Sequence, residues 1–170
     1  FPELPGRNKP VICAVNGLAV GGGFEIALAA DLVVAAEHAA FFLPETGLGI
    51  IPDAGAIRLP RILPPVVANE VLYAGRRLKA DEALQWGLVN AVVPIDRLLD
   101  EARALAARIM VSAPLAIEAV IAVDRTTRSL TLDEAFAHLR SGELDAYERM
   151  LASEDAEEGP RAFTEGRDPH

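Results

Sequence analysis

The stretch "VICAVNGLAVGGGFEIALAADLVVAAE", residues 11–37, decides the fold expected for the first half of this chain. It opens with an apolar run at 11–15 and reaches three consecutive glycines at 21–23. An Ala-rich segment that carries one carboxylate, Glu25, follows, and then a second apolar run at 32–36. Continuous apolar runs of this length are typical of strands buried on both faces. Because a short helical segment separates them, the stretch predicts an α/β fold.

The rest of the chain continues this order and then changes character. Further strands are expected at 40–43 and 88–93, and helices between proline and glycine boundaries at 64–75 and 79–87. From residue 95 onward apolar residues recur at helical spacing, with one such pattern over 131–153, and no strand is expected. Thr131, followed three residues later by Glu134, predicts a capping box. We therefore predict two regions, the later part of a β/α core at 1–94 and a helical region at 95–170. The Pro/Gly-rich opening, residues 1–10, has the composition of a connector, and we expect further sequence before it.

Composition narrows the class of protein. The chain has 170 residues, of which 51% are hydrophobic, and a net charge of −9, so a basic surface for nucleic acid is not expected. No uninterrupted apolar run reaches the roughly 18 residues of a membrane span, so we expect no membrane partner. The single cysteine, Cys13, excludes an internal disulfide and favours a cytoplasmic protein. The histidines match no metal spacing, so no metal site is expected.

The glycines and the two acids suggest chemistry on a carbonyl compound. A helix that starts after glycines exposes unpaired N–H groups, which can stabilise an oxyanion. Glu25 follows at once, and Glu45 follows in "FFLPETGLG", so one acid could act as base and the other as acid. Structural explanations also exist: a tight strand-to-helix junction, a first-turn glutamate that favours the helix dipole, and a surface turn. From the residues alone both explanations stay open.

The positions of the glycines and the residues that follow them exclude two nucleotide-binding motifs. A dinucleotide fold needs glycine where this chain has Ile26, with the glycines directly after the strand. A phosphate-binding loop needs a Lys-Ser/Thr pair after the glycines, and none follows. We therefore expect no nucleotide cofactor at this loop.

The chain resembles the enoyl-CoA hydratase/isomerase (crotonase) family from Lys9 to its C-terminus. The stretches that carry the resemblance are 9–55, "LPPVVANEVLYAGRRLKADEALQWGLVNAVV" at 63–93, "APLAIEAV" at 113–120 and "SEDAEEGPRAFTEGRDP" at 153–169. Within the family the similarity is greatest to carnitinyl-CoA dehydratase-like members. The resemblance implies a crotonase-like spiral of ββα turns followed by a helical trimerisation region, here with the first turns missing.

The resemblance also implies an activity and roles for single residues. It implies hydration of a 2-enoyl-CoA, or the reverse dehydration, with Glu25 taking a proton from the water that attacks C3 and Glu45 supplying a proton to C2. One oxyanion-hole N–H is placed at Gly22, and the neighbouring residues Gly21, Gly23 and Pro44 line the substrate. The acyl-CoA thioester is the implied partner, with CoA as part of the substrate and no cofactor. A homotrimer or a dimer of trimers is implied.

A third acid, Asp53 in "IIPDAG", keeps a second activity open. Some isomerases of the family use an aspartate at this place to move a proton between C2 and C4. The structural alternative is a turn after Pro52, where aspartate is common. Asp53 therefore leaves an enoyl-CoA double-bond isomerase as the alternative.

The chain departs from the family pattern in three places. About the front third of a typical member is absent, and it carries the second oxyanion N–H, so we expect this chain alone to be nearly inactive. The stretch "PDAGAIRLP" appears one residue shorter than usual, and Gly166 stands where relatives commonly carry a lysine near the CoA phosphates. Arg167 is then the substitute candidate. The missing front third favours a third hypothesis, a non-catalytic fragment or assembly subunit, which the intact glutamate pair opposes.

Overall fold

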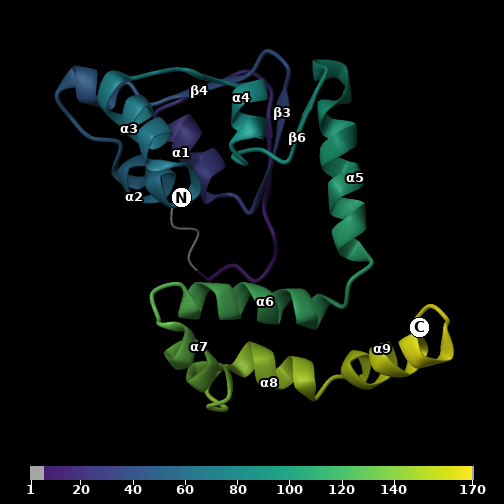
Figure 1. Ribbon diagram of the computed structural model, residues 1–170. Coiled ribbons are helices and arrows are strands. Elements are labelled where there is room, and N and C mark those ends of the chain that lie inside the picture. The colour runs from purple at the N-terminus through teal and green to yellow at the C-terminus, as the bar shows by residue number, and fades with distance from the viewer. Residues whose placement is uncertain (1–5, 170) are drawn as a thin grey trace. The chain divides into compact units, whose positions relative to one another are not determined.

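The computed structural model describes residues 6–169, so most of the connector expected at 1–10 lies outside the described residues. The chain divides into two compact units, the first ending at Ala107 and the second beginning at Arg108 (Figure 1). The boundary expected at 94/95 between a core and a trimerisation region stays a prediction.

The strands of the first unit form two small sheets within the described residues. They are β1 (Ile12–Val15), β2 (Leu18–Val20), β3 (Leu32–Ala36), β4 (Ala40–Phe42), β5 (Leu78–Lys79) and β6 (Ala91–Val93). One sheet has the order β1-β3-β6 and is parallel throughout. The other has the order β2-β4-β5, in which β2 and β4 are parallel and β4 and β5 antiparallel.

The two sheets are built by a repeated path of the chain. After β1 the chain passes through Asn16 and Gly17 into β2 of the other sheet, and after β3 it passes in the same way into β4. Ile12 pairs with Leu32 and Leu18 with Ala40, so each successive strand pair lies directly beside the previous one. Helix α1 (Gly22–Ala29) connects the two strand pairs. The result is one turn of a ββα spiral laid against the next.

The core of the first unit explains these strands. Four of the five residues of β3 are buried, as expected for the central strand of a parallel sheet. Phe24 of α1 and Phe41 of β4 are fully buried, with ring centroids 5.2 Å apart. Cys13 packs against this cluster, and burial raises the pKa of its thiol. The sheets and helices of this unit thus bury one large apolar cluster, and Val34 and Ala36 of β3 pack with Leu98 in a second, smaller one.

The helices of the first unit differ from expectation at one element. The helices are α1, α2 (Asp53–Ile62), α3 (Pro65–Ala74), α4 (Ala80–Gln85) and α5 (Leu98–Met110). The last turn of α5 belongs to the second unit. Two 3₁₀ turns, η1 (Glu45–Leu48) and η2 (Ile95–Arg97), complete the first unit. α2 was not expected, because Gly55 and Pro60 lower its helix propensity. It packs between α1 and α3, so tertiary contacts stabilise it (Figure 1).

The second unit is helical in its described part, as expected. Its helices are α6 (Pro114–Thr127), α7 (Leu132–Leu139), α8 (Asp145–Leu151) and α9 (Glu154–Glu165). α6 and α8 lie side by side, joined by an ion pair of 2.5 Å between Glu118 and Arg149 (Figure 1). Thr131 and Glu134 form the expected capping box at the start of α7.

Two features of the helical part were not visible from periodicity. The pattern over 131–153 is broken into α7 and α8, because Gly142 takes a φ of +76° between them. Among the described residues, no helix by itself has the length and apolar character to cross a membrane; the consecutive segments 95–110 and 114–127 meet that test only when counted together.

Candidate active site

Gly21 and Glu45 lie against each other because β2 pairs with β4. The register sets Val20 opposite Phe42, and the Gly21 N–H donates to the carbonyl oxygen of Phe42 at 3.1 Å. A Cβ at Gly21 would lie 2.5 Å from Oε1 of Glu45. Gly21 also has a φ of +50°, which side chains disfavour. Only glycine therefore leaves room for the Glu45 carboxylate at this point.

The turn η1 holds Glu45 in place. Pro44 precedes it, and its carbonyl oxygen accepts a hydrogen bond from Gly47 N–H at 3.0 Å. Thr46 Oγ1 donates to the carbonyl oxygen of Leu72 at 2.9 Å, which ties the turn to α3. Oε2 of Glu45 is buried and has no hydrogen-bond partner within residues 6–169. Buried polar atoms are rarely left in this state, so this oxygen is available to accept a hydrogen bond from a ligand.

Glu25 lies in the first turn of α1 and contacts the same glycine through its backbone. Its backbone N–H donates to the carbonyl oxygen of Gly21 at 3.0 Å, within the first turn of α1. Its carboxylate oxygen Oε1 accepts a hydrogen bond of 2.9 Å from the backbone N–H of Gly55 in the first turn of α2. The side chain is half-buried. The structure therefore brings Glu25 and Glu45, twenty residues apart, to the N-terminus of α1.

The N-terminus of α1 supplies the third part of the site. Gly22 and Gly23 are the first two residues of the helix, and both are exposed. A Cβ at either would meet no atom within 4 Å, so no described side chain covers them. First-turn N–H groups of a helix have no partner within the helix and carry positive partial charge. An oxygen that gains negative charge is stabilised in this position.

Asp53 is the first residue of α2, rather than part of an isolated turn after Pro52. It is exposed and lies two residues before Gly55, whose amide contacts Glu25. The glycine and acid candidates of the first unit, with Pro44, thus lie on the ends of β2, β4, α1 and α2.

Arg167 belongs to the second unit, where its guanidinium forms ion pairs with two carboxylates. Its guanidinium pairs with Glu158 at 2.5 Å and with Glu165 at 2.6 Å, and these hydrogen bonds raise its pKa. The preceding Gly166 ends α9 with a φ of +67°, a left-handed conformation that a lysine would adopt at a cost. The local helix end accounts for the glycine at this place.

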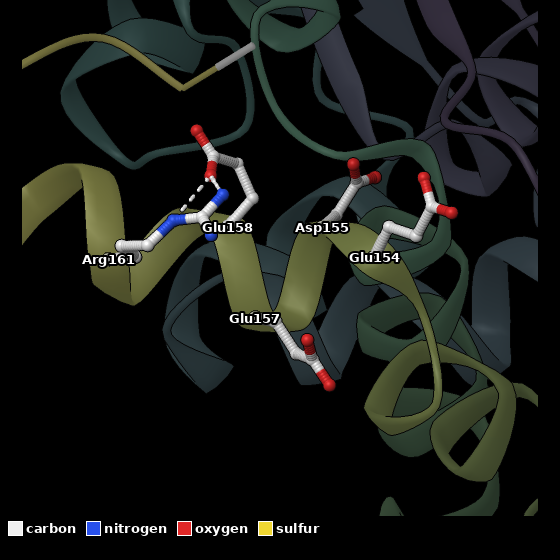
Figure 2. A pocket seen from close by; sticks show the side chains of 5 residues that line it. All are labelled: Glu154, Asp155, Glu157, Glu158 and Arg161. Carbon is white, nitrogen blue, oxygen red and sulfur yellow. Dashed lines mark hydrogen bonds and ion pairs between the residues drawn. The ribbon is translucent and has the colours of Figure 1, made fainter.

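A hollow of about 360 Å³ lies along α9 and contains none of the residues predicted from sequence. Its lining residues are Glu154, Asp155, Glu157, Glu158 and Arg161, and Figure 2 shows the side chains of Glu158 and Arg161 directed toward each other. Hydrogen bonds from Arg167 and then Arg161 lower the pKa of Glu158 to about 2. Because carboxylates dominate the lining, the hollow does not suit an anionic ligand. Among residues 6–169, no three His, Cys, Asp or Glu side chains are grouped to hold a metal ion.

Arg76 and Arg77, which follow α3, also contact other side chains. Arg76 pairs with Glu70 at 3.1 Å and with Glu82. The guanidinium of Arg77 lies 4.6 Å from the centre of the Phe42 ring, at the end of β4. Arg77 is thus placed by the same strand that places Gly21.

Two residues of the site were missed from sequence. Gly55 holds the Glu25 carboxylate, and Thr46 anchors the turn of Glu45. The sequence held no signal for Gly55, because the helix that contains it was not expected. No signal pointed to Thr46, since its partner is a backbone carbonyl 26 residues away.

Known proteins match this chain over almost all of its length. Residues 2–170 match the family model Enoyl-CoA hydratase/isomerase. The carnitinyl-CoA dehydratases of Salmonella arizonae and Escherichia coli K12 are each 55% identical over 168 residues, 98% of this chain and 64% of their own sequences. The chain thus spans less than two thirds of the length of these relatives.

Solved structures agree with the sequence matches. The enoyl-CoA hydratase of Mycobacterium tuberculosis H37Rv superimposes with a TM-score of 0.89 at 39% identity, over 100% of this chain and 66% of that one. The enoyl-CoA hydratase of Bacillus anthracis has a TM-score of 0.85 at 40% identity, over 96% of this chain and 62% of that one.

Proposed function

Because this chain belongs to the enoyl-CoA hydratase/isomerase family, with the crotonase-like fold expected from sequence, we propose that the protein hydrates a 2-enoyl-CoA or dehydrates a 3-hydroxyacyl-CoA. The observation that carries the proposal is that two glutamates lie at the N-terminus of α1, near Gly21. Glu45 lies against its Cα, and Glu25 is one helical turn beyond it. Two acids at one helix N-terminus provide both proton transfers that adding water requires.

The hydration step uses the two glutamates in opposite senses. Water attacks C3 of the enoyl thioester while the Glu25 carboxylate takes a proton from that water. The electrons of the C2–C3 double bond move toward the thioester carbonyl and give an enolate. C2 then takes a proton from Glu45, and the carbonyl is restored. Dehydration is the reverse, in which Glu45 removes the C2 proton and Glu25 protonates the departing hydroxyl.

The backbone of α1 stabilises the charge that develops in between. The Gly22 N–H, at the first position of the helix, donates to the enolate oxygen. Gly22 and Gly23 leave the approach free of side chains, since both are exposed. Charge on this oxygen is greatest in the transition state, so the contact favours the reaction rather than substrate binding alone.

The substrate class follows from the relatives. Those that share 55% identity are named for carnitinyl-CoA, so the proposed substrate is a 4-trimethylammonio-3-hydroxybutanoyl thioester or its 2-enoyl product. The activity requires no redox or metal cofactor, since the side chains and backbone named here perform the proton transfers and stabilise the enolate. A CoA thioester as substrate, together with one unpaired thiol, fits a cytoplasmic enzyme.

Double-bond isomerisation is the second candidate, and Asp53 is the observation in its favour. This carboxylate is exposed in the first turn of α2, two residues before Gly55, whose amide contacts Glu25. In an isomerase it would move a proton between C2 and C4.

Association of copies is part of the same proposal. The second unit exposes large apolar side chains on its helices and in the turn before α6, namely Met110, Val111, Val120, Leu132, Phe136, Leu151 and Phe163. Exposed apolar surface of this extent marks an interaction site. Since the resemblance to the family implies a homotrimer or a dimer of trimers, further copies of the protein are the proposed partners.

The test is an assay of the longest form of the protein that its gene encodes. Hydration of crotonyl-CoA and of 4-trimethylammonio-2-butenoyl-CoA is followed by loss of absorbance of the conjugated thioester. Hydration of either supports the proposed function. Conversion of a 3-enoyl-CoA to its 2-enoyl isomer, with no hydration of either thioester, would assign the protein to the isomerases instead.

A further inference from the structure

Asp53 is a carboxylate beside the proposed active site to which hydration gives no role. Among residues 6–169, no hydrogen bond or ion pair engages it. The arginines of the same helix donate to backbone carbonyl oxygens, Arg58 to Leu28 at 3.4 Å and Arg61 to Ile57. The Asp53 carboxylate is therefore exposed and forms no ion pair with a side chain among residues 6–169.

The surface before Asp53 is apolar. Leu48, Ile50 and Ile51 are 73%, 61% and 63% exposed, and they lie within the five residues that precede Asp53. A single carboxylate beside apolar side chains suits a cation with a methyl shell and no N–H group, because such a cation loses little hydration and needs no hydrogen-bond acceptor. A primary ammonium or a guanidinium would instead require several acceptors.

We propose, on the basis of the proposed function, that Asp53 is the specificity-determining residue that selects acyl thioesters carrying a quaternary ammonium on C4. Its carboxylate faces that cation, and the apolar side chains at 48–51 contact the methyl groups. The proposal concerns recognition of the substrate; Glu25 and Glu45 keep the proton transfers.

The chemistry of the substrate sets where the cation must lie. The quaternary nitrogen is bonded to C4, and C4 is bonded to C3, so the nitrogen is about 2.5 Å from the carbon that gains or loses water. Glu25 acts on the oxygen attached to that carbon. The amide that holds Glu25 belongs to Gly55, in the first turn of α2, and Asp53 begins the same turn. A substrate placed for reaction therefore brings its cation to the start of α2.

The proposal predicts an effect on KM and none on kcat. The ammonium charge does not change between the bound substrate and the transition state, so a contact with Asp53 stabilises both equally. Removing the carboxylate should raise KM for the cationic substrate and leave kcat in place. An ion pair in a partly dehydrated site corresponds to roughly a 10- to 100-fold effect on KM.

The experiment compares Asp53→Asn with the parent in the longest form of the protein, on three thioesters. They are 4-trimethylammonio-2-butenoyl-CoA, its neutral isostere 5,5-dimethyl-2-hexenoyl-CoA, and crotonyl-CoA. The isostere has the same shape and lacks only the charge. The matched control is Asp81→Asn, because Asp81 is an exposed first-turn aspartate of another helix, α4.

The expected result is a KM for the cationic thioester raised roughly 10- to 100-fold by Asp53→Asn, with kcat retained. The other two thioesters and the Asp81→Asn variant should be unaffected. Equal changes on all three thioesters, or none, would overturn the inference and leave Asp53 as a helix-start residue. A parent that hydrates none of them would reject the proposed function itself, and selective loss of isomerisation in Asp53→Asn would give Asp53 a catalytic role.

Discussion

The backbone N–H of Gly55 donates a 2.9 Å hydrogen bond to Oε1 of Glu25, which lies 30 residues earlier in the chain. The contact depends on close packing at Gly55. A Cβ there would lie 2.7 Å from Cδ1 of Leu43 and 3.0 Å from Cβ of Pro52. Because Gly55 has no side chain, the first turn of α2 packs closely enough on the end of β4 for its amide to reach the glutamate.

Replacing Gly55 by alanine should displace this amide. Since Leu43 is fully buried, it cannot swing into solvent, and α2 must shift. We expect a fall of about 10-fold or more in kcat for hydration and a loss of roughly 1–3 kcal/mol in the free energy of unfolding. Steady-state kinetics and urea unfolding measure the two effects.

Two further variants test whether the effect of Gly55→Ala comes from its clash with Leu43. Gly159→Ala is the control, because Gly159 is helical with open space around it, and the change should stabilise α9 by about 0.5–1 kcal/mol. The double variant Gly55→Ala/Leu43→Val removes part of the clash and should recover part of the activity. Unchanged kinetics in Gly55→Ala would show that the amide of Gly55 does not position Glu25.

Gly21→Ala should disturb the other glutamate. The new Cβ would lie 2.5 Å from Oε1 of Glu45, at a backbone φ of +50°. We expect the carboxylate to move, activity to fall at least about 10-fold, and stability to fall by about 1 kcal/mol or more from backbone strain. Gly17→Ala should change neither activity nor stability, because Gly17 has an ordinary φ and an added Cβ would meet no atom within 4 Å. A fully active Gly21→Ala variant would contradict the assignment of Glu45 to the site.

The two glutamates should each be necessary. Glu25→Gln and Glu45→Gln keep the shape of the side chain and remove its proton transfer, so each should lower hydration by roughly 10²- to 10⁴-fold. Glu37→Gln, at an exposed position after β3, is the control. The measurement is the rate of crotonyl-CoA hydration at saturating substrate. Near-parental rates in either glutamine variant would reject the paired mechanism.

Acid should destabilise α9 through Glu158. Hydrogen bonds from Arg167 and Arg161 lower its pKa from 4.5 to about 2, so folding favours the carboxylate. Its contribution is complete above pH 4.5 and is lost as the pH falls through 2. Glu158→Gln should therefore reduce the pH dependence of helix unfolding between pH 4.5 and 2, followed by hydrogen exchange in α9. Glu157→Gln, an exposed neighbour, should leave that dependence unchanged.

The protein should associate through the apolar side chains of its helical part. Light scattering should report the mass of three or six copies. Val120→Glu adds charge at an exposed apolar position of α6 and should weaken association, whereas Thr126→Glu adds the same charge at an exposed polar position and should not. A folded monomer at all concentrations would contradict the proposed assembly.

Much of the fold was predictable from local patterns in the sequence. The run 32–36 predicted β3 with its bounds, because an uninterrupted apolar run suits a strand covered on both faces. The capping box at Thr131 predicted the start of α7 because its hydrogen bonds join residues three apart. The resemblance over 9–55, 63–93, 113–120 and 153–169 identified the family, which the comparisons confirm.

The sequence by itself determined which groups the proposed site contains: three glycines, Glu25, Glu45 and Asp53. Only the tertiary structure decided how they meet. Helix α2 forms despite Gly55 and Pro60, because it packs between α1 and α3, and no local pattern records that contact. Glu45 reaches Gly21 through the register of β2 and β4, and Glu25 is held by an amide 30 residues away. Propensity and periodicity act over a few residues, whereas these contacts exist only after distant segments have packed together.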